Sequence, residues 1–217
     1  MTTPKERPIP FKGEMVRAIQ ADSKTQTRRI VKLPPLQPWQ LGSGGWDFIE
    51  CNHSLEDCNN FIAGFSDGLG TIINIKCPYG TPADPIFGRP ADRLWVRETW
   101  AVQHEYDAAS PRYIGASARW HYAATEDLGG LRKRPSIFLP RRGSRILLEI
   151  AAVRVERLQS ISGPDCWAEG IAHAGWDPER YGSVVECYRD LWESINGPGS
   201  WAANPWVWVV EFRRVQP

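Results

Sequence analysis

The stretch from Ser23 to Arg29 holds the densest set of reactive side chains in the sequence, with an amine, hydroxyls, an amide and two guanidiniums. Lys24 and Thr27 are a potential base and nucleophile, because a buried lysine loses its proton more readily and then accepts the proton of a hydroxyl. A solvated basic edge strand, whose charges discourage pairing with other strands, is the alternative that this spacing leaves open.

The elements on either side predict how this stretch is held. Residues 11–22 carry apolar side chains at helical spacing and indicate a short amphipathic helix. The β-branched pair after Arg29 indicates a strand that ends near Lys32, before several prolines. Alternate side chains of a strand share a face. We therefore expect Thr25, Thr27 and Arg29 to point one way, and Gln26 and Arg28 to point the other.

Composition limits the class of protein. The 217 residues are 42% hydrophobic and 24% charged, which suits one or two globular domains. The net charge of +1 creates no global field, so any binding of anions must depend on local clusters. We expect no membrane segment, and the N-terminus lacks the apolar run of a signal peptide. The odd number of cysteines, five, favours reduced thiols in a cytoplasm.

Two irregular regions, at about 33–90 and 101–134, read as insertions in a single domain spanning 1–217. The first holds Cys51, His53, Cys58 and Cys77, which are candidate ligands for zinc. Their spacing is not that of a standard paired knuckle, and ordinary buried thiols are the alternative. We therefore expect no cofactor, with zinc as the exception to test.

Arginines gather near residues 132–145. Arg141, Arg142 and Arg145 flank a proline-bounded apolar segment and are candidates for contact with phosphates, which position a nucleic acid without reading its sequence. A solvated basic loop is the alternative. Arg97, in an alternating segment 93–98 that predicts a strand, joins Thr25, Arg28 and Arg29 as a further candidate for binding the substrate.

The last third of the chain has the clearest periodicity. A β-type run over 146–158 predicts a strand with a bulge near Ala151–Ala152. Ser162 and Asp165 indicate the start of a very short helix that carries Glu169 and ends at Gly170. A long apolar stripe over 180–195 predicts a helix that faces the core. Residues 206–212, apolar on both faces, predict a central strand.

Taken together, these segments resemble the ASCH domain, a PUA-like β-barrel family, and within it the phage and prophage subgroup. The matching pieces occur in the family's order and span nearly the whole chain. They are Lys24–Arg29 with its preceding helix, Cys77–Gly80, Asp92–Glu98, Cys166–Ile171 and Trp208–Phe212. The sequence departs from the pattern at Ala91, where a glycine is usual, and in its two long insertions.

The resemblance implies an α+β fold: a small barrel with flanking short helices and a cleft beside the lysine and threonine strand. Domains of this family are thought to bind RNA or modified nucleosides. A small bacterial member that is an N4-acetylcytidine amidohydrolase uses a threonine, a lysine and a glutamate. By motif, these roles fall on Thr27, Lys24 and Glu169 of this chain.

The function expected from this resemblance is hydrolysis of an amide on a modified nucleoside, in the cytoplasm of a bacterial host if the protein is phage-encoded. Lys24 takes the proton of Thr27, Thr27 attacks the acyl carbon, and Glu169 orients Lys24 or manages the proton on the leaving amine. A binding module for RNA or nucleotides without turnover, and a ribonuclease, are the alternatives. The sequence leaves the oligomeric state open.

Overall fold

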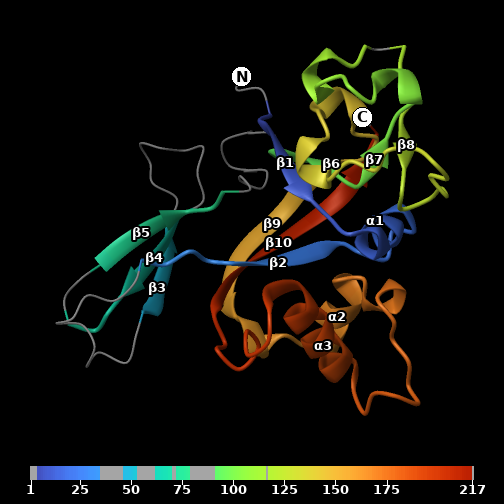
Figure 1. Ribbon diagram of the computed structural model, residues 1–217. Helices are drawn as coiled ribbons and strands as arrows, with labels where there is room; N and C mark the ends of the chain where they lie inside the picture. The colour runs from blue at the N-terminus through green and yellow to red at the C-terminus, as the bar shows by residue number, and fades with distance from the viewer. Residues whose placement is uncertain are drawn as a thin grey trace.

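The computed structural model of the protein describes residues 4–34, 46–52, 62–69, 72–78, 91–115 and 117–216 (Figure 1). Within these ranges the chain is a mixed α+β fold, with three sheets and three α-helices. None of the helices in this part of the chain has both the length and the apolar character needed to cross a bilayer.

A five-stranded sheet forms the centre of the molecule, in the order β1 (Glu6–Pro10), β6 (Arg93–Arg97), β9 (Leu147–Arg157), β10 (Trp206–Val215) and β2 (Gln26–Ile30). β1 runs parallel to β6, and the other neighbours are antiparallel. β10 lies between β9 and β2, as its two apolar faces predicted. β1 is an outer strand, a position that tolerates its prolines because they lack an N–H for a second neighbour.

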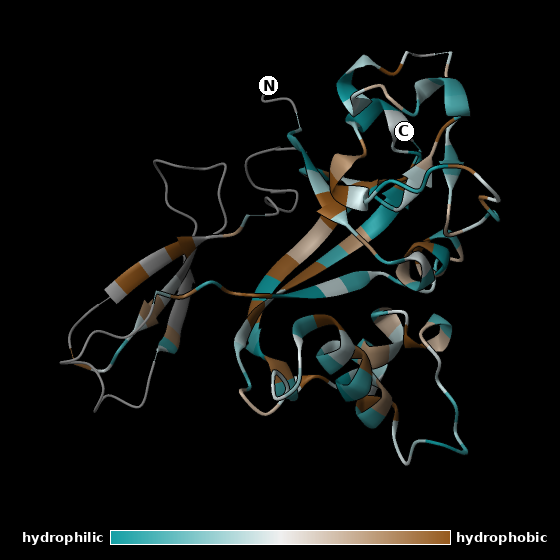
Figure 2. Ribbon diagram, in the orientation of Figure 1, coloured by the Kyte–Doolittle hydropathy of each residue, from teal (hydrophilic) through white to brown (hydrophobic). Residues whose placement is uncertain are grey.

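The long strand β9 bends where the sequence predicted a bulge. Glu211 of β10 pairs with Ala152, whereas the next residue, Phe212, pairs with Ile150, so Ala151 is the extra residue. An extra residue of this kind bends a strand and increases its twist. Figure 2 shows hydrophobic residues concentrated along β9 and β10. The described strands pair as an open sheet, with β1 and β2 at its two edges.

Three α-helices flank the sheet: α1 (Gly13–Gln20), α2 (Gly163–Ala168) and α3 (Val184–Asn196). α1 buries Met15, Val16, Ala18 and Ile19, which is the face that its helical spacing predicted, and all of these except Ala18 belong to the main core. α2 and α3 pack together over a second core that includes Cys166, Tyr188 and Trp192. Short 3-10 helices lie between these elements: His104–Tyr106, Pro111–Tyr113, Ser136–Phe138, Arg141–Gly143, Leu158–Ser160 and Ile171–His173.

The region 33–90, irregular by its sequence pattern, contains a three-stranded antiparallel sheet of β3 (Asp47–Asn52), β4 (Ile62–Ser66) and β5 (Ile72–Lys76). Phe48 and Phe65 of this sheet pack against Trp206 at the start of β10, with ring centroids 5.8 and 6.0 Å apart. The region 101–134 contains most of a third small core, around Trp100 and Leu139, and the strand pair β7 (Trp100–Ala101) and β8 (His121–Tyr122).

Candidate functional site

The stretch between α1 and β2 is held by main-chain hydrogen bonds on two sides. Lys24 and Glu169 form an antiparallel β-bridge. The N–H of Thr25 donates to the carbonyl of Ala168 over 2.8 Å, and the carbonyl of Thr25 accepts from the N–H of Phe212 over 2.8 Å. The backbone that carries the lysine and the threonine is therefore fixed to the end of α2 on one side and to β10 on the other.

The local sequence of α2 explains why Glu169 is placed there. Ser162 caps the helix through a reciprocal pair of hydrogen bonds with Asp165, and Glu169 is the C-terminal cap. Gly170 follows in the left-handed region, at φ 83°. A Cβ atom on Gly170 would lie 2.8 Å from the Cβ of Ala18 and 3.0 Å from that of Lys24. Glycine thus permits both the turn and the close approach of α2 to α1.

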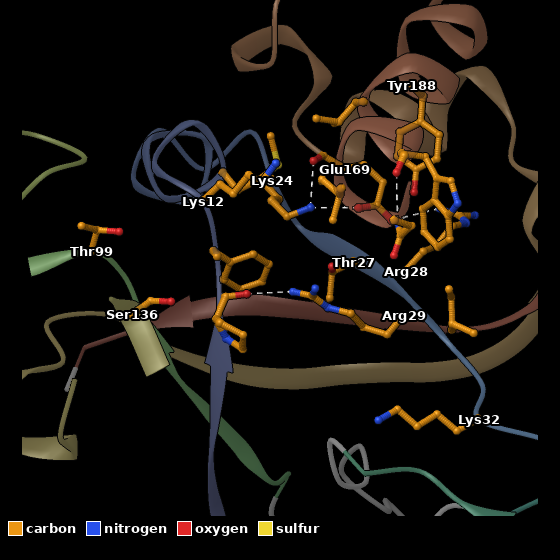
Figure 3. A pocket seen from close by; sticks show the side chains of 18 residues that line it. Lys12, Lys24, Thr27, Arg28, Arg29, Lys32, Thr99, Ser136, Glu169 and Tyr188 are labelled. Carbon is orange, nitrogen blue, oxygen red and sulfur yellow. Dashed lines mark hydrogen bonds and ion pairs between the residues drawn. The ribbon is translucent and has the colours of Figure 1, made fainter. Parts of the chain in front are cut away.

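Lys24, Thr27 and Glu169 line one pocket of about 470 Å³, which lies between β2, the β1–α1 turn and α3 (Figure 3). The sequence predicted that these three residues act together, and the structure brings them together. The other residues of the lining are Pro10, Phe11, Lys12, Met15, Arg28, Arg29, Ile30, Lys32, Thr99, Ser136, Tyr188, Leu191, Trp192, Ile195 and Asn196.

Lys24 and Glu169 form a buried pair, with residue exposures of 4% and 3%. The Lys24 ammonium donates to Oε2 of Glu169 over 2.9 Å and to the Glu169 carbonyl over 2.8 Å. Burial lowers the pKa of Lys24 more than the carboxylate raises it, and the charges of Arg29 and Arg28 lower it further. This environment favours the neutral amine that a general base requires.

Arg28 also pairs with the carboxylate of Glu169. Its guanidinium donates to Oε1 of Glu169 over 3.3 Å and to Glu156 over 2.9 Å, and it forms an ion pair with Asp165 at 3.4 Å. Its side chain has no exposed surface. Arg28 lines the pocket, as expected of a substrate-binding residue, but the contacts of its guanidinium are to three carboxylates of the protein.

Arg29 points to the other face of β2 and reaches across the pocket. Its guanidinium donates to the carbonyl of Pro10 over 2.9 Å and lies over the ring of Phe11, 5.3 Å from the centroid. Its Nε has no hydrogen-bond partner among the described residues. The side chain of Arg29 therefore links the outer strands β2 and β1.

The remaining arginines expected to bind substrate lie outside this pocket. Arg141 pairs with Glu6, and Arg142 donates to two backbone carbonyls, of Pro111 and Arg112. Arg145 makes a bidentate pair with the buried Glu98. The guanidinium of Arg97 stacks on Trp95 at 4.6 Å from the ring centroid, and burial lowers its pKa. Thr25 and Arg145 line a second, neighbouring hollow near Phe212.

Sequence reasoning missed the wall of the pocket that α3 provides. The apolar stripe of this helix was expected to face the core, and much of it does. However, Tyr188, Leu191, Trp192 and Ile195 also line the pocket, and Ile195 is 45% exposed. The sequence does contain a signal for this wall, because the apolar stripe continues beyond the residues that the core buries. However, an apolar pattern does not distinguish residues of the core from residues that line a pocket.

The candidate zinc ligands are only partly visible. His53 and Cys58 lie outside the described residues, as does the side chain of Cys51. Cys77 is buried and is not part of a disulfide bond. In the described ranges, no three histidine, cysteine, aspartate or glutamate side chains are grouped in a way that suits a metal ion.

Comparison with protein families, curated proteins and solved structures identifies no match for this chain. The function must therefore be argued from the site.

Proposed function

We propose that this protein is an amidohydrolase that removes an acyl group from the amine of a modified nucleoside, in a deacetylation of the N4-acetylcytidine type. We further propose that the chain belongs to the ASCH family that its sequence resembles, that its fold is a PUA-like barrel, and that it acts in the cytoplasm. The observation that carries it is the convergence of Lys24, Thr27 and Glu169 at one pocket, although Glu169 lies 145 positions from Lys24 in the chain.

In this reaction Lys24 acts first as a base. The neutral amine accepts the proton of the Thr27 hydroxyl, and the Thr27 oxygen attacks the acyl carbon to give a tetrahedral oxyanion. Collapse of this intermediate breaks the C–N bond, and the ammonium of Lys24 returns the proton to the departing amine. A water molecule then hydrolyses the threonine ester in the same way, with Lys24 again as the base.

Glu169 and the two arginines prepare the site for this chemistry. Glu169 holds the lysine amine in place through two hydrogen bonds. Because Glu169 also pairs with Arg28, its negative charge raises the pKa of Lys24 less than it would alone. Arg29 lines the same pocket, and its positive charge would stabilise a developing oxyanion.

The size and lining of the pocket suit a nucleoside. A volume of about 470 Å³ lies in the range of small-molecule sites. Tyr188, Trp192 and Phe11 contribute to an apolar wall, and pockets for small molecules are lined mainly by hydrophobic and aromatic side chains.

The test is turnover of a panel of N4-acylated cytidines, as free nucleosides and within RNA, followed by mass spectrometry. The wild-type protein should release the acyl group, whereas Thr27→Ala and Lys24→Ala should lose at least about 100-fold in rate, as expected for loss of a nucleophile or a base. Thr27→Ser, which keeps the hydroxyl, should retain part of the activity. Full activity in a correctly folded Thr27→Ala protein would exclude this mechanism.

Binding without turnover is the second candidate, and the aromatic and cationic lining of the pocket favours it. In that case the wild-type protein would bind nucleosides or RNA with an affinity that falls as salt rises. The acyl group would stay in place, and Thr27→Ala would bind as well as the wild type.

A further inference from the structure

The charges that line the pocket are unequal. Five cationic residues line it: Lys12, Lys24, Arg28, Arg29 and Lys32. Glu169 is the one carboxylate in the described lining, and it is already paired with two of the five.

Among the described residues, the remaining three cations are not paired with a carboxylate. Arg29 is bonded to a neutral carbonyl, and no described carboxylate forms an ion pair with Lys12 or Lys32. A neutral nucleoside would leave this positive charge unused. A nucleoside that carries a phosphate would neutralise part of it.

Hydroxyls lie at one end of the pocket. In Figure 3, Thr99 and Ser136 lie beyond Lys12 on the side of the β1–α1 turn, with both hydroxyls directed toward the pocket, and Arg29 reaches toward the same side from β2. Neither hydroxyl has a hydrogen-bond partner in the part of the chain that the structure describes. An ammonium, a guanidinium and two hydroxyls are a donor set that suits phosphate oxygens.

We infer that the substrate carries a phosphate, held by Lys12, Arg29, Thr99 and Ser136 while its acyl group lies at Thr27. The substrate class is therefore an N-acylated nucleotide, either as a free monophosphate or as a residue in RNA, and the neutral nucleoside is a poor ligand. This inference rests on the proposed function for the acyl group, but its binding test does not require turnover.

The test compares N4-acetylcytidine, its 5′-monophosphate, its 3′-monophosphate and a trinucleotide with the acetylated base at its centre. Equilibrium binding to the Thr27→Ala protein is measured by calorimetry, and kcat/KM is measured with the wild type. One phosphate-bearing form should bind about 10- to 100-fold more tightly than the nucleoside, which corresponds to one or two charge-assisted hydrogen bonds. A monophosphate that binds best identifies a free nucleotide, whereas a trinucleotide that binds best identifies RNA.

Variants distinguish a specific phosphate site from a general electrostatic attraction to the phosphate. Lys12→Gln and Ser136→Ala should reduce the ratio of nucleotide to nucleoside affinity toward one. Lys133→Gln, which removes the same charge from an exposed residue outside the pocket, should keep the ratio. If Lys32→Gln abolished the ratio as fully as Lys12→Gln, a diffuse field would explain the preference and the assigned site would be wrong.

The two proposals fail in different ways. Equal kcat/KM for nucleoside and nucleotides, with release of the acyl group from both, would overturn the phosphate site and leave the amidohydrolase standing. Preferential binding of a nucleotide without release of the acyl group would overturn the amidohydrolase and leave the phosphate site standing.

Discussion

Arg28 shows how a charged residue expected to contact a ligand serves the protein instead. The alternation of the strand predicted that Gln26 and Arg28 share a face, and both reach Asp165, at 3.0 and 3.4 Å. The carboxylates that pair with Arg28 belong to residues that lie 128 to 141 positions away in the chain. A sequence pattern shows on which face a side chain lies, but it does not show which distant element covers that face.

The buried charge of Arg28 should set the pH dependence of the reaction. The proposed mechanism requires neutral Lys24, so kcat/KM should rise with pH through the pKa of Lys24. Arg28→Gln removes a nearby cation and leaves Glu169 with Lys24 as its main partner. Both effects raise the pKa of Lys24. We expect the acidic limb of the kcat/KM profile to move to higher pH.

Arg154→Gln is the matched control for this prediction. Arg154 contacts Glu156 and Asp165, but its described contacts do not include Glu169. Its loss should weaken the same network and leave the limb in place. If both variants moved the limb equally, the effect would not come from the charge on Glu169. Arg28→Lys, which keeps the positive charge, should restore part of the wild-type profile and serves if Arg28→Gln does not fold.

The roles of the site residues were therefore only partly accessible from the sequence. We predicted that Lys24, Thr27 and Glu169 lie together from a sequence motif and from a short helix with clear capping residues. Tyr188 and Trp192 were assigned to the core, because an apolar side chain in a helix looks the same whether it faces a core or a pocket. Lys12, Thr99 and Ser136 were not predicted as site residues, since each comes from a different short connecting segment of the chain.

At the scale of elements, the end of α2 determines the geometry of the site. Gly170→Ala introduces a Cβ that would contact Ala18 and Lys24, in a left-handed residue. The left-handed conformation alone costs about 1 kcal/mol, and the forced displacement adds about 1–3 kcal/mol. We expect a loss of about 2–4 kcal/mol in the free energy of unfolding, measured with denaturant, and a fall in kcat because Glu169 moves relative to Lys24.

Gly175→Ala separates strain from displacement. Gly175 also lies in the left-handed region, at φ 95°, but a Cβ there would meet nothing within 4 Å. This variant should lose only about 1 kcal/mol and keep its kcat. Equal losses in the two variants would show that close approach to α1 is not what requires glycine at position 170.

Elements with strong local signals were predicted well. The capping pair of α2, its glycine terminus, the bulge at Ala151 and the central place of β10 all follow from short stretches of sequence. β3, β4 and β5 were not predicted, because their stability comes from pairing with one another and not from a local pattern. In the described pairings, β1 and β2 do not pair with each other, so the sheet is not closed into a barrel. The barrel is therefore part of the proposal.

At the scale of the molecule, an aromatic cluster joins the two larger sheets. Trp206 contacts Phe48 and Phe65, and its indole N–H donates to the carbonyl of Trp46 over 2.8 Å. Trp206→Ala should cost about 3–5 kcal/mol in the free energy of unfolding. Because Trp206 is not part of the pocket lining, we expect turnover of small substrates at low temperature to persist while the thermal midpoint falls.

Limited proteolysis gives a second measurement of this variant. Cleavage within residues 46–78 should become faster in Trp206→Ala, because β3 and β4 lose their contact with β10. Trp201→Ala, at a partly buried tryptophan that packs with Tyr188 in the second core, serves as the control and should not accelerate cleavage there. Loss of turnover before loss of fold in Trp206→Ala would show that the two sheets are coupled to the site.

The double attachment of the Lys24–Thr27 backbone has a consequence for how this protein changes over evolution. The groups proposed to react lie on a segment fixed to β10 and to the end of α2, whereas the opposite walls come from the exposed end of α3 and from short connecting segments. Substitutions in those walls can alter which acyl compound is accepted without disturbing the reaction itself. Related chains are thus expected to keep one chemistry and to diversify in the compounds they process, and new selectivity should be reachable by randomising Leu191, Ile195 and Ser136 alone.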